Sequence, residues 1–344
     1  MKLINNDKVH DQLLKNNQLP LAFDPSLDYE EWKNKVAKKY AQLLKIDTIE
    51  SNVCALNFEI EEKVETKEYT RYRFTFEAEK DCIVPCYLLI PKTNKAKYPV
   101  CICLQGHTPG MHISIGIAKK EEDNKKIESN AYALFAVQNG YAALCIEQRG
   151  MGERQPASEY RQYPIPTCYF PSMTALILGR TIIGERVWDI SKAIDCLENF
   201  RQLDLEDITC LGHSGGGTAT YYATCYDKRI KTAVCSCCFS TFRESIGELC
   251  HCACNYIPDI ATQFDMAELS CLIAPRTLIL QCGGIDTIFS IKGARQQFEK
   301  VKQIYEKAGA KDNCFFIETD TGHKFRQELV FPKLKKMREN KNDK

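Results

Sequence analysis

The stretch LGHSGGG, residues 211–217, places one serine among four glycines. Its core, Gly212-x-Ser214-x-Gly216, follows the apolar stretch DITCL and precedes small residues that can open a helix. Between a strand and a helix, such a turn holds the serine exposed at its apex, and the glycines let neighbouring backbone approach closely. Ser214 is therefore the candidate nucleophile, and a merely flexible turn is the alternative.

A serine hydroxyl needs a base to take its proton and a carboxylate to orient that base. Of the six histidines, only His251 and His323 follow Ser214. His323 stands in TDTGHKF, just after the apolar stretch NCFFIE, whereas His251 precedes the next predicted strand and so falls out of order. We predict that His323 is the base, the alternative being a histidine of a surface loop.

The predicted acid is Asp286, which follows the apolar stretch RTLILQC and Gly283-Gly284. A turn aspartate that caps its own backbone is the alternative reading. Asp320 is the second choice, but it lies only three residues before His323. The remaining candidates, Asp259 and Asp265, precede the strand.

Two backbone N–H groups must stabilise the negative charge that develops on the attacked carbonyl oxygen. The first predicted donor is Gly215, directly after the serine. The second lies in QGHTPG, the loop after the apolar stretch VCICL, where His107 is the first choice and Gly106 the second.

The chain holds 19 cysteines, most of them within apolar stretches, where they are expected to be buried thiols in a reducing compartment. The densest group is CHCAC, Cys250 to Cys254. Its C-x-C spacing differs from the C-x2-C of common zinc sites, so we expect structural thiols, no metal and no cofactor. A metal site in this stretch is the alternative.

With 46 basic and 45 acidic side chains among 344 residues, the chain has no electrostatic signature of nucleic-acid or anionic-membrane binding. The N-terminus lacks the apolar stretch of a secretory signal, and no apolar run reaches the ~18–20 residues of a membrane span. We therefore expect a cytoplasmic protein.

The order of elements indicates the fold class. Residues 28–45 read as a helix with an Asp28–Glu31 capping pair, and residues 57–91 read as antiparallel strands. From Tyr98 on, short apolar runs alternate with amphipathic stretches, which predicts an α/β, doubly wound, mostly parallel sheet. We divide the chain into an N-terminal helical extension, 1–50, and a catalytic domain, 51–344. The extension packs on this domain or on a neighbouring subunit of a homo-oligomer.

Two long stretches, 107–128 and 151–181, interrupt the alternation after strand ends, where ligands of open α/β sheets bind. The second is rich in aromatic residues and is expected to act as a lid or a substrate wall, unless it is ordinary surface packing. The predicted substrate contacts are Tyr160, Tyr163, Tyr169 and Phe170.

Taken together, LGHSGGG, IAPRTLILQCGGIDTIF, TDTGHKF, LQGHTPG and EQRGMGE resemble the α/β-hydrolase superfamily, in its acetyl xylan esterase and dienelactone-hydrolase-like branch. The resemblance covers about residues 80–338. It implies a serine esterase with the triad Ser214, Asp286 and His323, in a branch that includes enzymes removing acetyl groups from carbohydrates. The chain departs from lipases, which have HGGG where Gln105-Gly106-His107 stands, and from dienelactone hydrolases proper, which usually have a cysteine nucleophile.

The leading hypothesis is a carboxylic ester hydrolase that acts on a small-molecule or oligosaccharide ester. A serine peptidase or amidase with the same triad is the alternative. A non-catalytic or metal-binding protein on the same fold is a third reading.

Overall fold

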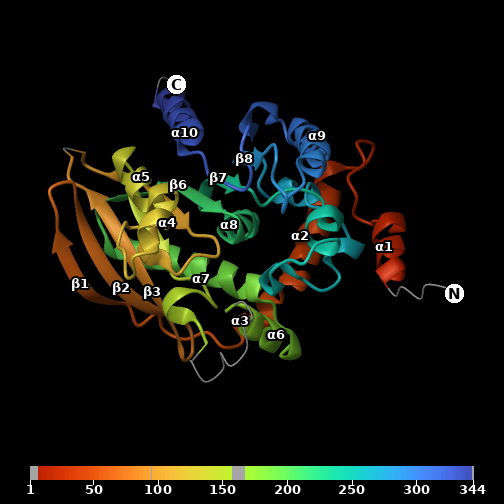
Figure 1. Ribbon diagram of the computed structural model, residues 1–344. Helices are drawn as coiled ribbons and strands as arrows, with labels where there is room; N and C mark the ends of the chain where they lie inside the picture. The colour runs from red at the N-terminus through yellow and green to blue at the C-terminus, as the bar shows by residue number, and fades with distance from the viewer. Residues whose placement is uncertain (1–6, 94, 157–166, 343–344) are drawn as a thin grey trace.

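The computed structural model describes residues 7–93, 95–156 and 167–342. Its centre is a nine-stranded sheet with the order β1-β2-β3-β5-β4-β6-β7-β8-β9 (Figure 1). The strands are β1 (Glu59–Glu65), β2 (Tyr69–Glu79), β3 (Cys82–Pro91), β4 (Tyr98–Leu104), β5 (Ala142–Ile146), β6 (Leu203–His213), β7 (Ile230–Ser236), β8 (Thr277–Gly283) and β9 (Cys314–Thr319).

The sheet has an antiparallel part and a parallel part. Strands β1, β2 and β3 pair antiparallel, and β3 joins β5 in the same way. From β5 to β9 all neighbours are parallel. Since the carboxyl ends of parallel strands share one edge, the loops after β4, β6, β8 and β9 are brought together there. The predicted change from antiparallel to parallel pairing is confirmed.

Helices cover both faces of the sheet. The longer helices are α1 (Asp7–Asn16), α2 (Tyr29–Leu44), α4 (Asp123–Asn130), α5 (Tyr132–Gln138), α6 (Tyr169–Ile177), α7 (Ile182–Cys196), α8 (Gly215–Tyr226), α9 (Ile291–Lys307) and α10 (Gln327–Asn342), with a short α3 (Ile46–Glu50). One face packs on α2, α7, α8 and α9, and the other packs on α5 and α10.

Successive side chains along a strand point to opposite faces of the sheet, so the hydrophobic core consists of two clusters, one on each face. In β8, Leu278 and Leu280 belong to the larger cluster, and Ile279 between them belongs to the smaller one. In β4, Val100 and Cys101 separate in the same way. Every residue of β4 and β8 is buried, as expected for parallel strands covered on both sides.

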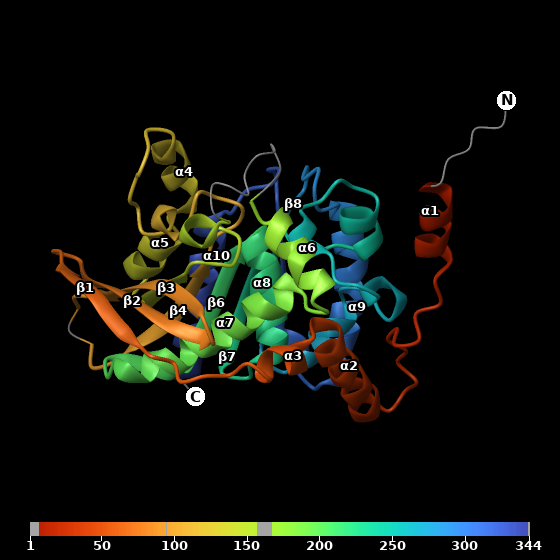
Figure 2. The same cartoon turned by 90° about the horizontal axis from the view of Figure 1, so that it is seen from below.

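The N-terminal helices differ in how they are attached. The predicted capping residue of α2 is confirmed, because the Asp28 side chain accepts a hydrogen bond of 2.8 Å from the Glu31 amide. Trp32, Val36 and Tyr40 of this helix lie in the larger core cluster, so α2 packs on the same domain as the sheet. Helix α1 has no buried residue and lies at the edge of the molecule (Figures 1 and 2). The boundary at residue 50 stays a prediction.

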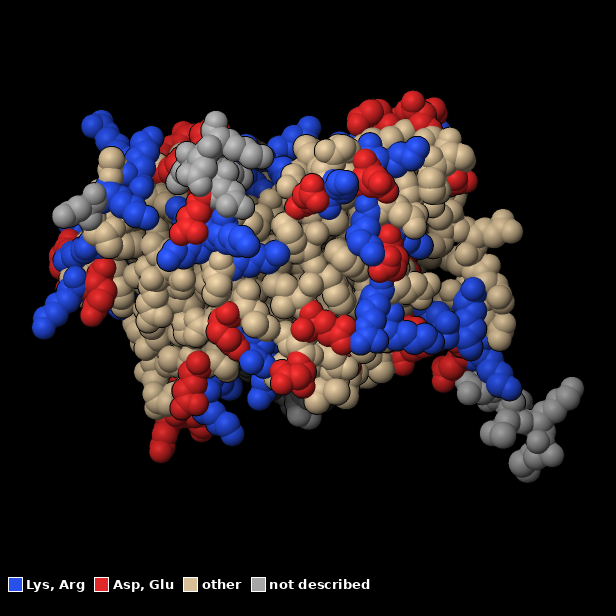
Figure 3. Space-filling model, turned by 90° about the horizontal axis from the view of Figure 1, so that it is seen from above, with Lys and Arg blue, Asp and Glu red and all other residues tan. Residues whose placement is uncertain are grey.

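Basic and acidic side chains are interspersed on the face seen in Figure 3. Within the described ranges, we find no helix with the length and hydrophobicity needed to cross a bilayer.

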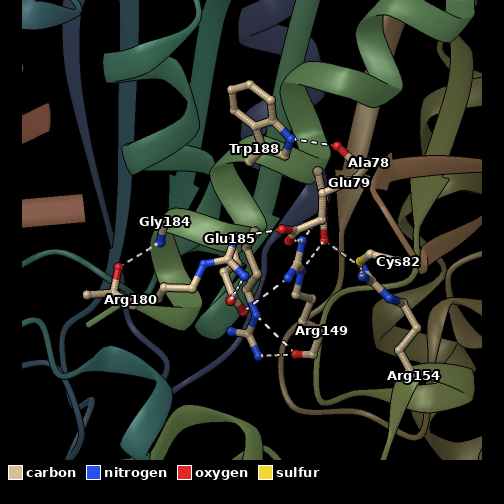
Figure 4. A network of polar contacts seen from close by, with 12 residues as sticks. Ala78, Glu79, Cys82, Arg149, Arg154, Arg180, Gly184, Glu185 and Trp188 are labelled. Atoms are coloured by element: carbon tan, nitrogen blue, oxygen red, sulfur yellow. Dashed lines mark hydrogen bonds and ion pairs between the residues drawn. The ribbon is translucent and has the colours of Figure 1, made fainter. Parts of the chain in front are cut away.

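A buried ion network holds the loop that follows β5. Arg149 lies between Glu79 and Glu185 (Figure 4), and its guanidinium also contacts Asp189 at 2.9 Å. Arg154 reaches the same Asp189 at 2.7 Å. These contacts join the end of β2 and helix α7 to EQRGMGE, the segment that follows β5 at the carboxyl end of the parallel strands.

Candidate active site

Ser214 stands at a sharp turn between β6 and α8. Its φ of 54° and ψ of −124° lie outside the usual regions for a residue with a side chain. The turn is held by the Ser214 amide, which donates to the Ser236 carbonyl at 2.8 Å. A Cβ on Gly212 would lie 2.2 Å from the Gly216 carbonyl oxygen, so the turn closes only with glycine there. This is the strained strand-to-helix geometry that presents a serine hydroxyl.

Asp286 and His323 form a hydrogen-bonded pair. His323 Nδ1 lies 2.8 Å from Asp286 Oδ2, although the residues follow different strands, β8 and β9. Burial alone would raise the pKa of Asp286, but the His323 hydrogen bond and the amides of Ile288 and Phe289 lower it below its usual range. An ionised Asp286 directs the Nδ1–H of His323 toward itself and leaves Nε2 as the basic atom.

The ring of His323 lies against the residue that precedes the serine. Its centroid is 4.8 Å from that of His213, and Phe289 stacks on it at 6.2 Å. Burial and the neighbouring His323 lower the pKa of His213 to about 3, so His213 is neutral at physiological pH. His323, the predicted base, therefore lies next to the strained turn without a second positive charge from His213.

The other sequence candidates for the acid and base have different partners. Asp320 is exposed and pairs with Arg326 at 3.0 Å. Asp265 accepts from the Phe242 and Met266 amides, and Asp259 is exposed in a left-handed turn.

His251 is paired with Asn255 at 2.9 Å, but its ring also lies 5.3 Å from that of Phe289. His251 therefore belongs to the wall of the site rather than to the pair with Asp286.

The loop after β4 lies against the serine turn. A Cβ on Gly106 would lie 3.1 Å from Ser214 Cβ, and one on Gly215 would lie 2.8 Å from His107 Cε1. Gly215 is the first residue of α8, so its N–H has no partner within the helix and is available to an incoming oxygen. The structure thus brings Gly106, His107 and Gly215 around the serine, and their role as oxyanion donors stays a prediction.

A buried carboxylate anchors this loop, and the sequence pattern did not single it out. Glu147, directly after β5, accepts from Gln105 Nε2 at 2.8 Å and from the Met111 amide at 3.1 Å. Burial raises the pKa of Glu147 to about 7. The segment EQRGMGE contained this residue, but only the folded chain shows that it faces Gln105.

The predicted substrate contacts divide into two groups. Tyr160 and Tyr163 lie outside the described residues. Tyr169 and Phe170 begin α6 and are 44% and 43% exposed. Phe170 lines a surface pocket of about 400 Å³ together with Arg149 and Arg154. Their role in substrate binding stays a prediction.

The cysteine-rich stretch contributes to a cluster beside the site. Cys252 and Cys254 lie with Cys168 and His107, and the four ligand atoms are within 4.8 Å of one another. Cys250 is exposed and takes no part in this group. Spacing within CHCAC did not show the cluster, because half of its members come from distant loops.

Comparisons with known proteins agree with the architecture. A sequence model described as "alpha/beta hydrolase fold" matches residues 125–248. A Bacteroides fragilis NCTC 9343 protein, described as a "putative acetyl xylan esterase", has a TM-score of 0.81 at 17% identity, covering 98% of this chain and 96% of that one. A glucuronoyl esterase from Solibacter usitatus has a TM-score of 0.61 at 16% identity, covering 92% and 97%. The fold is that of an α/β hydrolase, resembling acetyl xylan esterases, as the motifs predicted.

The model of the Abhydrolase family matches residues 2–179, more than half of the sequence. The chain belongs to this family. A Bacillus subtilis (strain 168) protein named "Putative hydrolase YtaP" is 24% identical over 242 residues, which is 70% of this chain and 77% of that protein.

Proposed function

We propose that the protein is a serine carboxylic ester hydrolase that removes acetyl or other small acyl groups from carbohydrate. The observation that carries this proposal is the 2.8 Å pair of Asp286 and His323 beside the strained turn at Ser214. A surface serine with no catalytic role would not require such a turn next to an oriented imidazole.

The reaction proceeds in two halves. Ser214 Oγ attacks the ester carbonyl while His323 Nε2 takes its proton, and the amides of Gly215 and His107 stabilise the oxyanion. The intermediate collapses to an acyl-serine, and His323 returns the proton to the departing sugar alcohol. Water then attacks the acyl group in the same way, which releases the carboxylic acid and restores Ser214. Asp286 stabilises the imidazolium that forms in each half.

The carbohydrate part of the proposal is supported by the neighbours. The similar structures include an acetyl xylan esterase from Paenibacillus sp. R4, glucuronoyl esterases and a methylesterase. The exposed rings of Tyr169 and Phe170 offer apolar faces of the kind that sugar rings stack on. An ester is also an easier substrate than an amide, since its alkoxide leaving group departs with less protonation.

The test is hydrolysis of 4-nitrophenyl acetate, acetylated xylo-oligosaccharides, a methyl ester of glucuronic acid and an aminoacyl amide by the intact chain. We expect turnover of the two acetyl esters, and a loss of about 10⁴-fold or more in Ser214→Ala. Ser240→Ala, a buried serine outside the site, is the matched control and should retain activity. Preference for the amide would replace the esterase proposal by the peptidase alternative. Full activity in Ser214→Ala would show that Ser214 is not the nucleophile.

A further inference from the structure

The cluster of Cys168, Cys252, Cys254 and His107 has the donor set of a structural zinc site. Three thiol sulfurs and one imidazole nitrogen converge from the loop after β4, the residue before α6 and the segment 252–254. Cys3His is one of the common tetrahedral zinc arrangements. Four such side chains from three separate segments seldom meet in one place by packing alone.

The distances suit a metal ion. His107 Nε2 lies 3.2 Å from Cys254 Sγ, and Cys254 Sγ lies 3.4 Å from Cys252 Sγ. A tetrahedral zinc would set sulfur atoms about 3.8 Å apart and nitrogen and sulfur about 3.6 Å apart. The observed spacings, up to 4.8 Å across the set, therefore need shifts of only a few tenths of an ångström to about one.

A buried cation beside the cluster supplies an independent indication. Arg186 is 1% exposed, and its Nη1 has no hydrogen-bond partner in the described part of the chain. Its positive charge acts on the sulfurs of Cys168 and Cys254. Zinc with three thiolates and a neutral imidazole carries a net negative charge, which this arginine would balance in a region where an unpaired charge is costly.

We propose that Cys168, Cys252, Cys254 and His107 bind one Zn²⁺ that fixes the oxyanion loop to the segment 252–254. Four protein ligands leave no open position, so the ion is structural and does not act on the substrate. His107 can take part in both the zinc site and the oxyanion site because it uses different atoms in each. Its side-chain Nε2 faces the cysteine sulfurs, and its backbone N–H belongs to the loop beside Ser214. Binding exchanges the thiol protons of the three cysteines for the ion.

The first experiment measures metal in the full chain. The protein is incubated with zinc, desalted and analysed by plasma mass spectrometry. We expect about one zinc per chain in the wild type, and the same in Cys250→Ser, which lies in the same stretch but outside the cluster. After the same desalting, Cys254→Ser and Cys168→Ser should retain at most about a tenth of the zinc that the wild type retains. No retained zinc in the wild type, or equal retention in Cys254→Ser, would overturn the site.

Cobalt substitution tests the ligands even where a cysteine variant fails to fold. Wild-type protein loaded with Co²⁺ should show the strong visible d–d absorption bands of a tetrahedral ion. It should also show a near-ultraviolet thiolate-to-cobalt charge-transfer band with the intensity expected for three bound thiolates. A spectrum without the thiolate band would overturn the assignment. So would a disulfide within the cluster, detected as fewer than 19 free thiols in the denatured, metal-free chain.

The zinc proposal stands apart from the proposed esterase activity. Ser214 is not one of the four zinc ligands, so the Ser214→Ala variant should bind zinc as the wild type does. A chain that holds zinc but hydrolyses no ester would contradict only the activity, and an active chain without zinc would contradict only the site.

Discussion

His323 Nδ1 meets Asp286 Oδ2 at 2.8 Å across the carboxyl ends of two neighbouring strands. The side chain of Asp286 is almost fully buried, while that of His323 is 23% exposed. The aspartate thus anchors the pair in the protein, and the imidazole is partly open to solvent.

From this relationship we expect Asp286→Asn to lower kcat about 10³- to 10⁴-fold, because an amide at this position stabilises the wrong tautomer of His323 and cannot balance an imidazolium. Steady-state hydrolysis of 4-nitrophenyl acetate provides the measurement. Asp320→Asn is the matched control, since Asp320 is exposed and pairs with Arg326. An equal loss in both variants would mean that Asp286 is not the orienting acid.

The close approach of Gly106 to Ser214 gives a second prediction. A methyl group on Gly106 would lie 3.0 Å from the His213 carbonyl oxygen and 3.1 Å from Ser214 Cβ, so the loop and the serine turn must shift apart by a few tenths of an ångström. We expect Gly106→Ala to fold and to lose about 10²-fold in kcat, as for the loss of one oxyanion donor. Gly322→Ala, where the nearest atom is 3.5 Å away, should remain active. Wild-type kcat in Gly106→Ala would place the oxyanion donors elsewhere.

The raised pKa of Glu147 leads us to expect that the stability of the folded chain depends on pH. Its pKa is about 7 in the folded chain against an ordinary value of 4.5, because the carboxyl group is buried. Between these values the folded state holds a proton that the unfolded state has released, so the free energy of unfolding falls as pH rises from about 4.5 to about 7. The change is on the order of 3 kcal/mol.

Urea unfolding of Glu147→Gln across this pH range should show a smaller decline than the wild type, because glutamine carries no titrating proton. The exposed Glu206→Gln should decline as the wild type does. If the free energy of unfolding of Glu147→Gln fell with pH as steeply as that of the wild type, another group would be responsible for the pH dependence.

The sequence was most informative where local pattern and fold agree. The apolar runs of the parallel strands and the capped helix that begins after Asp28 were predicted because each is a short element with its own periodicity. The strained serine was predicted because a tight strand-to-helix turn requires glycines at this fixed spacing. Helix α10 was not predicted, although Val330 and Leu334 are buried at helical spacing.

What the sequence could not show is contact between distant side chains. His107 was chosen for its backbone amide, and nothing near it indicated that its ring would meet Cys254, 147 residues further on. The hydrogen bond between Gln105 and Glu147 likewise forms only because β4 pairs with β5 and brings the two strand ends together. Such contacts follow from strand order, which periodicity alone does not give.

The attachment of α2 to the domain gives the last prediction. Asp28 caps the helix through the Glu31 amide, and Trp32 and Tyr40 pack in the same core as the sheet. Removing the cap should therefore destabilise the whole domain, and we expect Asp28→Ala to lower the free energy of unfolding by about 1 kcal/mol. Asp28→Asn retains an accepting oxygen and should stay close to the wild type, as measured by urea unfolding followed by circular dichroism. If residues 1–50 were an arm that unfolds separately, Asp28→Ala would leave the main transition unchanged and produce an earlier, smaller one.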